Sequence, residues 1–247
     1  PQVTLVLGHC GGTASAIAGM SDIVVMSKNG SLFVNGPRVV SAVAGKELSL
    51  DDIGGTSASV RSGMAQLAVE TDEEAIALAR KVVAMLPANN MDEAMDLPRD
   101  DMNRELAQFN AIEKVDDVRD VLRAVADLGD IVELGEDFAP SMVTALGKLG
   151  GATVGFIANQ PAKDEGRLTV YGCKKAARFA AFCDCFSIPI ITVVDSMGMK
   201  ISTAPPPMPP AMMTSTPLSA RKFGRKPGLW PGFGTASADT ILPFSAS

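Results

Sequence analysis

Hydrophobic and β-branched residues cluster in short runs near the start of the chain, and each run predicts a buried strand. The first run covers residues 2–7 and leads into a glycine-rich stretch at 8–12. Small residues that favour a helix occupy 13–20, and further apolar runs follow at 22–26 and 32–34. This order predicts a strand, a glycine turn that opens a helix, and two more strands.

The clearest helical pattern lies at residues 71–86. Thr71 and Glu74 have the spacing of a capping box, the early acidic residues suit the helix dipole, and Pro87 predicts the end of the helix. One apolar stripe is expected to face the core, formed by Ile76, Ala79, Val82, Val83 and Leu86.

A second set of elements is predicted after a polar, turn-rich stretch. These are an amphipathic helix around 118–125, a strand at 131–134, a β-hairpin over 142–158 turning at Gly150-Gly151, a helix over 173–186 and a strand over 188–194. The order strand, hairpin, helix, strand recurs in outline. It therefore predicts two related α/β halves.

We divide the chain accordingly into a first domain at 1–95, a linker at 96–111, a second domain at 112–203 and a tail at 204–247. Nine of the 16 prolines lie in the tail, whose apolar residues show no periodicity. Such a segment cannot bury enough apolar surface to offset its ordering entropy, so we expect it to be extended or disordered, as a natural proline-rich tail or as an aberrant end. Because Pro1 stands at the mouth of a strand, we also expect a truncated N-terminus.

Composition narrows the class of protein. Hydrophobic residues make up 47% of the chain, which is enough for a sizeable core. The formal net charge of −6 argues against nucleic-acid binding, which needs clustered Lys and Arg. No apolar run approaches the roughly twenty residues of a membrane span, and the four cysteines lack the usual zinc spacing. We expect a cytoplasmic protein with reduced thiols, no nucleic-acid partner and no membrane insertion.

The glycine-rich stretch is the strongest candidate for chemistry. Its glycines let a ligand approach the backbone, and amides at a helix start favour a negative oxygen. A phosphate or an oxyanion formed during a reaction would suit such amides, and purely structural glycines are the alternative. The dinucleotide fingerprint G-x-G-x-x-G is absent, because Gly8 is followed by His9-Cys10 and a glycine pair. A nucleotide site is therefore the weaker choice.

Side chains offer little for catalysis. His9 is the only histidine, which excludes a histidine triad or a His-rich metal site within this chain. Ser15 lacks a surrounding G-x-S-x-G motif, and Thr13 suits a helix cap. Asp195 ends an apolar strand and is either catalytic or a turn carboxylate. Chemistry through backbone amides, without a side-chain base, suits the sequence better than a side-chain mechanism.

An ordered set of segments over residues 1–200 resembles one family. In the first half the segments are Pro1–Gly8, Met20–Met26, Leu32–Pro37, Gly54-Gly55, Ser62-Gly63 and Leu86–Asn90. In the second half they are Val154–Pro161, Lys174–Phe179, Cys183-Asp184, Ile188-Pro189 and Val194-Asp195. They resemble the carboxyltransferase subunits of biotin-dependent acyl-CoA carboxylases and decarboxylases, such as propionyl-CoA carboxylase beta and methylmalonyl-CoA decarboxylase alpha.

The resemblance implies an α/β fold of the crotonase type, a ββα superhelix in two incomplete domains. Residues 1–95 would be the C-terminal part of an acyl-CoA-binding domain, and 112–203 the first part of the carboxybiotin-side domain. Such subunits move a carboxyl group between carboxybiotin, on a separate carrier, and the α-carbon of a short-chain acyl-CoA. By position, the amides of Gly11, Gly12 and Thr13 would hold the thioester enolate. Acyl-CoA, the biotin carboxyl carrier protein and a hexamer-like homo-oligomer are the implied partners.

Departures from the family pattern lead us to expect a fragment that is inactive alone. Ser196–Met199 stands where Pro-Gly-Phe is common, residues 204–247 do not resemble the family, and Gly11–Thr13 differs from the usual Ala-Gly-Gly. Two alternatives remain open. One is a crotonase-type hydratase or isomerase, which would need a pair of glutamates near the turn. The other is a non-catalytic remnant that only oligomerises.

Overall fold

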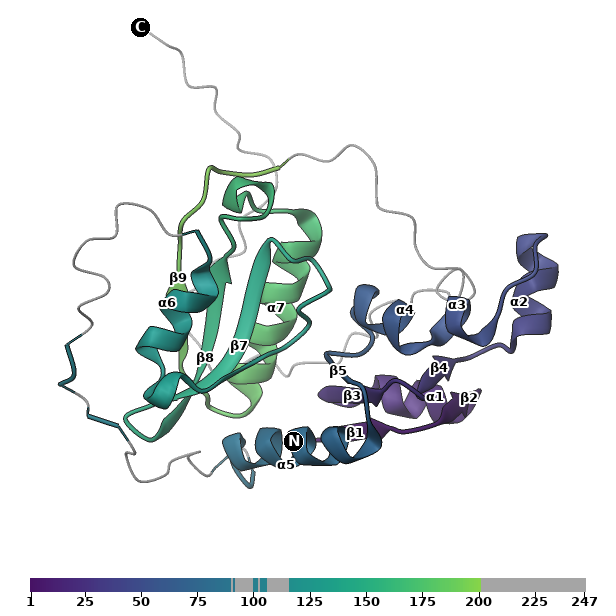
Figure 1. Ribbon diagram of the computed structural model, residues 1–247, viewed down its shortest axis with the longest axis horizontal. Helices are drawn as coiled ribbons and strands as arrows, with labels where there is room; N and C mark the ends of the chain where they lie inside the picture. Colours follow the sequence, from purple (N-terminus) through teal and green to yellow (C-terminus); the bar gives the residue numbers. More distant parts are fainter. Residues whose placement is uncertain (90, 92–99, 102, 106–115, 201–247) are drawn as a thin grey trace, which may run out of the picture. The chain divides into compact units, whose positions relative to one another are not determined.

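The structure is a computed structural model, which describes residues 1–89, 91, 100–101, 103–105 and 116–200 (Figure 1). All of these residues fall within one unit, Pro1–Thr214. The predicted tail at 204–247 and most of the predicted linker at 96–111 lie outside the described residues.

The first half repeats a strand–strand–helix unit. The first unit is β1 (Val3–Val6), β2 (His9–Gly11) and α1 (Thr13–Gly19), and the second is β3 (Ile23–Ser27), β4 (Ser31–Phe33) and α2 (Pro37–Ala44). β1 pairs in parallel with β3, and β2 pairs in parallel with β4. Each passage of the chain therefore adds one strand to each of two sheets. This is the ββα superhelix that the resemblance implies.

Three helices and one strand complete the first half. They are α3 (Leu50–Gly54), α4 (Thr56–Arg61), β5 (Leu67–Val69) and α5 (Asp72–Met85). β5 pairs in parallel with β3, which gives the sheet order β1-β3-β5. α5 lies along this sheet, and its buried residues share a core with Ile23 and Val25 of β3 (Figure 1).

The start of α5 has the capping contacts that the sequence predicted. The Thr71 hydroxyl accepts from the amide of Glu74, and the Glu74 carboxylate accepts from the amide of Thr71, both at 3.2 Å. The predicted capping box is thus confirmed. The predicted apolar stripe is partly wrong, because Ile76 and Val83 are 49% and 55% exposed whereas Ala75 is buried. The buried face of α5, which shares a core with the sheet, is formed by Ala75, Ala79, Val82 and Met85.

The second half is a four-stranded sheet covered by helices on both faces. Its elements are α6 (Val118–Val125), β6 (Ile131–Glu133), β7 (Met142–Leu149), β8 (Ala152–Asn159), α7 (Val170–Cys185) and β9 (Ile190–Val193), with short 3-10 turns at Asp127–Gly129 and Asp164–Gly166. The strand order is β6-β7-β8-β9, antiparallel except for β9, which is parallel to β8. α7 is therefore the crossover between two parallel strands.

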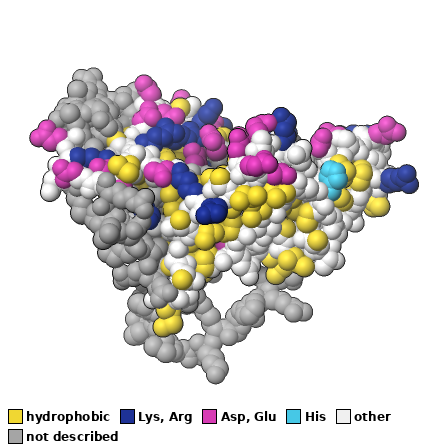
Figure 2. Space-filling model, turned by 60° about the horizontal axis from the view of Figure 1, so that its bottom comes forward, with side chains coloured by type: hydrophobic (Ala, Val, Ile, Leu, Met, Phe, Trp, Pro, Cys, Tyr) yellow, Lys and Arg dark blue, Asp and Glu magenta, His cyan; other side chains and the backbone are white. Residues whose placement is uncertain are grey.

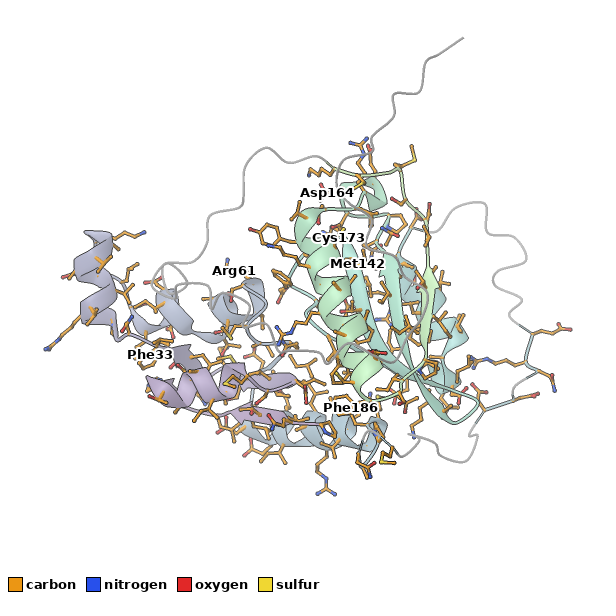
Figure 3. All side chains as sticks on the ribbon, turned by 180° about the vertical axis from the view of Figure 1, so that it is seen from behind. Phe33, Arg61, Met142, Asp164, Cys173 and Phe186 are labelled. Atoms are coloured by element: carbon orange, nitrogen blue, oxygen red, sulfur yellow. The ribbon has the colours of Figure 1, made fainter. Side chains whose placement is uncertain are left out.

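The two faces of this sheet carry different cores. Val118 and Leu122 of α6 pack on one face together with Phe156. Phe179 and Cys183 of α7 pack on the other face, and their core extends into the first half (Figure 3, where Cys173 lies in the first turn of α7 and Phe186 directly follows the helix).

The predicted hairpin is confirmed as β7 and β8. Gly150 and Gly151 both have positive φ, at 60° and 83°, as the tight primed turns of hairpins require. The prediction that a hairpin recurs in the first half is wrong, since β1 and β2 belong to different sheets.

The few described residues of the predicted linker contact the second half. The Arg104 guanidinium donates to the carbonyl oxygens of Ala124 and Ala126, at 2.6 and 2.7 Å, where α6 ends. A cation at this position satisfies carbonyl groups that have no partner within the helix. Among the described helices, none combines the length and apolar character that crossing a bilayer requires.

Candidate functional site

The glycine-rich stretch forms a strand and a helix start, where the sequence predicted only a turn. His9–Gly11 pairs in parallel with Ser31–Phe33, and Gly12, with φ of 65°, is the N-cap residue of α1. The Gly12 amide donates to the carbonyl oxygen of Phe33 at 2.9 Å. It is therefore committed to the β2–β4 pairing and is not free for a ligand, which corrects the predicted set of donors.

The Gly11 amide points away from β4, unlike the Gly12 amide. The bonds between β2 and β4 use Gly8, whose oxygen accepts from Ser31 at 3.1 Å, and Gly12. Alternate residues of a strand point their amides to opposite sides, so the Gly11 N–H lies on the side of β2 away from β4. A Cβ at Gly11 would come 2.6 Å from an atom of the Phe33 ring, so any other residue there would require this ring to shift.

Thr13 and Ser15 have simpler roles. Thr13 is the first helical residue and is exposed, and its amide is one of those that a helix start leaves without an intrahelical acceptor. It does not cap α1, because the cap position is Gly12 and no side chain bonds there, which corrects the expectation. Ser15 is buried and donates to the oxygens of Gly12 and Phe33, at 2.8 and 3.0 Å, so it fixes the turn.

A cavity of about 330 Å³ lies beside this turn, between β1 and α1. It is lined by Thr4–Cys10 of the first strands and by Ala14, Ile17 and Ala18 of α1. No Asp, Glu, Lys or Arg is among these lining residues, so the site shows no sign of the glutamate pair that a hydratase needs. Figure 2 shows the single histidine beside hydrophobic side chains on this part of the surface. The walls suit an apolar chain better than a phosphate.

The structure keeps His9 near the turn and places Asp195 elsewhere. The Nδ1 atom of His9 lies 2.9 Å from the hydroxyl of buried Ser31, across the β2–β4 pair. The exposed ring therefore has a fixed orientation at the edge of the cavity. Asp195 is exposed just after β9 and lines neither this cavity nor the second one.

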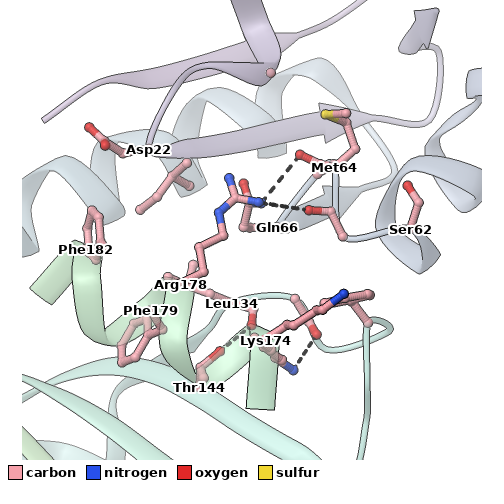
Figure 4. Close-up of a pocket in the computed structure, with 17 residues that line it drawn as sticks. Asp22, Ser62, Met64, Gln66, Leu134, Thr144, Lys174, Arg178, Phe179 and Phe182 are labelled. Atoms are coloured by element: carbon pink, nitrogen blue, oxygen red, sulfur yellow. Dashed lines mark hydrogen bonds between the residues drawn. The ribbon is translucent and has the colours of Figure 1, made fainter. Parts of the chain in front are cut away.

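A second cavity, of about 340 Å³, lies between α7 and the turn at Ser62–Gln66 (Figure 4). Its walls include Phe138, Phe179 and Phe182, and Lys174 and Arg178 of α7 also line it. The two cavities share no lining residue.

Lys175 is a buried cation in the wall of the second cavity. Only 6% of the residue is exposed, and its ammonium donates to the carbonyl oxygens of Gly135 and Met142, at 2.6 and 2.7 Å. Burial lowers the pKa of this ammonium to about 8, and the negative charge of Glu133 acts in the opposite direction. Sequence analysis did not single out Lys175. The signal was its spacing with Phe179 and Cys183, which puts a lysine on the apolar face of a helix.

Comparison with known proteins gives one consistent family. The family profile described as "Carboxyl transferase domain" matches residues 1–205. The methylmalonyl-CoA carboxyltransferase 12S subunit of Propionibacterium freudenreichii subsp. shermanii is 37% identical over 204 residues, which cover 80% of this chain and 39% of that subunit. The propionyl-CoA carboxylase carboxyltransferase subunit of Haloferax mediterranei is 36% identical, over 82% and 41%. Methylmalonyl-CoA decarboxylase subunit alpha of Veillonella parvula is 35% identical, over 82% and 42%. The chain thus spans about two fifths of the length of these relatives.

Solved structures agree with the fold. Transcarboxylase 12S, crystallised as a hexamer with hydrolysed methylmalonyl-CoA bound, superposes with a TM-score of 0.78 at 34% identity and covers 82% of this chain and 41% of its own. A single-chain long-chain acyl-CoA carboxylase, at 24% identity, superposes with a TM-score of 0.69. Together with the strand–strand–helix repeat, these neighbours confirm the predicted α/β, crotonase-like class.

Proposed function

Because this chain belongs to the carboxyl transferase domain family, we propose that it is part of a subunit that moves a carboxyl group to or from the α-carbon of a short-chain acyl-CoA. The observation that carries the proposal is the amide of Gly11. Gly11 is in register with Phe33, but by the alternation of strand amides its N–H points away from β4. The turn is flanked by Cys10 and Ala14, which both line the apolar cavity. The position of the Gly11 amide suits an acyl group in the cavity with the thioester oxygen at the turn.

In this proposal the chain stabilises negative charge on the thioester oxygen. When the α-carbon loses its proton or its carboxyl group, the thioester becomes an enolate with negative charge on oxygen. An amide already aimed at this position stabilises the enolate more than the ground state, typically by about 3 kcal/mol per donor. We assign the first donor to Gly11 and the second to Thr13, whose amide is free of the helix ladder.

We propose that biotin acts as a substrate that is attached to another protein. Carboxybiotin, when bound, would supply the carboxyl group by cleavage of its N–C bond, and the ring nitrogen freed by that cleavage would accept the proton that leaves the α-carbon. Within residues 118–200 the only glycine pair is Gly150-Gly151, which lies in the β7–β8 turn and does not open a helix. The described part of the second half therefore shows no glycine turn at a helix start that could serve the biotin carbonyl.

Calorimetric titration with propionyl-CoA tests the acyl-CoA site. We expect saturable binding that Ala14→Trp weakens by about tenfold or more, because the indole would fill the cavity. Ala16→Trp adds the same side chain at another exposed position of α1 that does not line the cavity, and should bind as the parent chain does. Binding that is absent, or equal in the two variants, would reject the proposal in favour of a non-catalytic remnant.

Assembly and location belong to the same proposal. The transcarboxylase relative forms a hexamer, and we propose a comparable homo-oligomer, with a biotin carboxyl carrier protein as partner, for the protein that contains this chain. We also propose the cytoplasm as its compartment, because the cysteines are free thiols. The division into domains at 1–95, 112–203 and a tail at 204–247 is likewise a proposal.

A further inference from the structure

The second cavity combines an aromatic interior with a cationic edge. Phe138, Phe179 and Phe182 contribute apolar surface to its walls, and Lys174 and Arg178 are exposed one helical turn apart on α7 (Figure 4). Its volume of about 340 Å³ lies within the usual range of small-molecule sites. An apolar interior with charge on one side suits a ligand that has both an apolar body and a charged group.

The charges of the lining favour an anion. Among the described lining residues, the cations Lys174, Lys175 and Arg178 outnumber the carboxylates, of which there is one, Asp22. Its oxygen accepts from the amide of Gln2 at 2.7 Å. This positive excess stands out in a chain of net charge −6. Within the described residues, neither Lys174 nor Arg178 forms an ion pair: the Lys174 ammonium lies 5.3 Å from the centre of the Tyr171 ring, and Arg178 donates to the carbonyl oxygen of Gly63 at 3.2 Å.

Buried Lys175 adds a second, independent observation. Its two bonds are to neutral carbonyl groups, and no carboxylate of the described residues lies within 4 Å of its ammonium. Glu133, Glu136 and Asp137 favour the charged form without pairing directly with it. A buried cation with no directly paired carboxylate is costly, and an anion in the adjoining cavity would offset part of that cost. The wall itself therefore favours a negatively charged occupant.

We propose that the cavity between α7 and the Ser62–Gln66 turn binds a small amphipathic carboxylate, with its chain against Phe179 and Phe182 and its carboxylate at Lys174 and Arg178. The site is separate from the proposed acyl-CoA cavity, since the two have no lining residue in common. It would let a free carboxylic acid, as distinct from a CoA thioester, bind the same subunit.

Titration of the 247-residue chain with octanoate, followed by calorimetry and by ligand-observed NMR, tests the site. We expect saturable binding at one site, weakening from octanoate to hexanoate and lost for acetate, which lacks the apolar body. Octanol and octylammonium should bind at least about tenfold more weakly than octanoate, because they lack the negative charge.

Matched variants locate the binding. Lys174→Gln and Arg178→Gln should each weaken octanoate binding about tenfold. Arg80→Gln removes one charge from an exposed position of α5 that does not line the cavity, and should leave binding unchanged. Far-ultraviolet circular dichroism confirms that each variant is folded. No saturable binding, equal binding of octanol, or equal losses in Arg178→Gln and Arg80→Gln would each overturn the proposal. Propionyl-CoA binding would stand in any of these cases.

Discussion

The amide nitrogen of Gly12 lies 2.9 Å from the carbonyl oxygen of Phe33, and this bond decides which amides of the glycine turn can serve a ligand. It ties the start of α1 to the end of β4. Because neighbouring strand amides alternate in direction, the same bond turns the Gly11 amide to the open side of β2.

Gly11→Pro tests the assigned donor, with Gly11→Ala as the matched control. Both substitutions place a Cβ against Phe33, 2.6 Å from its nearest ring atom, but only proline removes the amide hydrogen. We expect both to weaken propionyl-CoA binding similarly. A CoA analogue with a nitronate in place of the thioester enolate should distinguish them, with proline about a hundredfold weaker than alanine, as for the loss of one oxyanion donor.

Calorimetric titration of both variants with both ligands supplies the measurement. The comparison rests on the ratio between the ligands, so a general loss of structure in Gly11→Pro would lower both affinities and cancel. Equal affinity of the two variants for the nitronate would remove Gly11 from the site.

The sequence predicted the elements of this fold better than their partners. Apolar runs and the Thr71–Glu74 capping box are local signals, and the strands and α5 appear close to the predicted positions. β2 was not predicted, because a His-Cys-Gly segment has little intrinsic preference for a strand. It becomes one through pairing with β4, twenty-two residues away from His9 to Ser31. This register depends on tertiary contacts, and no local sequence pattern indicates it.

The candidate site was likewise predicted in its local features and not in its tertiary contacts. A glycine-rich stretch before a helix correctly located a backbone feature beside a cavity, but the choice among its amides required the β2–β4 register. Thr13 looked like a cap because of its residue type, whereas the chain enters α1 through Gly12 with a positive φ. Lys175 had a recognisable helical spacing, yet its carbonyl partners Gly135 and Met142 come from distant segments.

Thr71→Ala should destabilise the first half modestly. The hydroxyl satisfies the amide of Glu74 at the start of α5, and alanine offers no acceptor there. Loss of such a cap typically costs about 1 kcal/mol in the free energy of unfolding. Thr71→Ser keeps the oxygen and should remain within a few tenths of the parent chain, as measured by urea denaturation. Equal losses in the two variants would show that the hydroxyl is not what stabilises the helix.

Gly155→Ala should be more damaging, because α7 packs directly on this glycine. A Cβ would lie 2.7 Å from the Cys183 sulfur and 3.0 Å from the Phe179 ring. Overpacking of this kind costs about 1–3 kcal/mol. Gly8→Ala, where a Cβ has nothing within 4 Å, is the control and should change little. Adding Cys183→Ala to Gly155→Ala should recover part of the loss in thermal denaturation; no recovery would contradict the packing argument.

Lys175 should make stability depend on pH in the alkaline range. Burial lowers its pKa to about 8 in the folded chain from 10.5. Between these values the unfolded chain binds more protons than the folded chain, so the free energy of unfolding rises with pH. Below pH 8 both states carry the proton, and the cost of the buried charge is fully present. The full rise amounts to about 3 kcal/mol, at roughly 1.4 kcal/mol per pKa unit.

Lys175→Met isolates this contribution, because it replaces the lysine by an unbranched side chain that is one heavy atom shorter and has no proton to exchange. The charged groups that influence the pKa of Lys175 are Glu133, Arg119, Glu136 and Asp137. All four are present in the parent chain and in Lys175→Met. Stability measured by urea denaturation should therefore rise in the parent chain relative to Lys175→Met from pH 8 to pH 10.5. Lys174→Met removes the exposed neighbouring ammonium and should follow the parent profile. If the difference in the free energy of unfolding between the parent chain and Lys175→Met stays constant or falls over this range, the ammonium is not buried in its charged form. Lys175 would then no longer support an anion in the adjoining cavity.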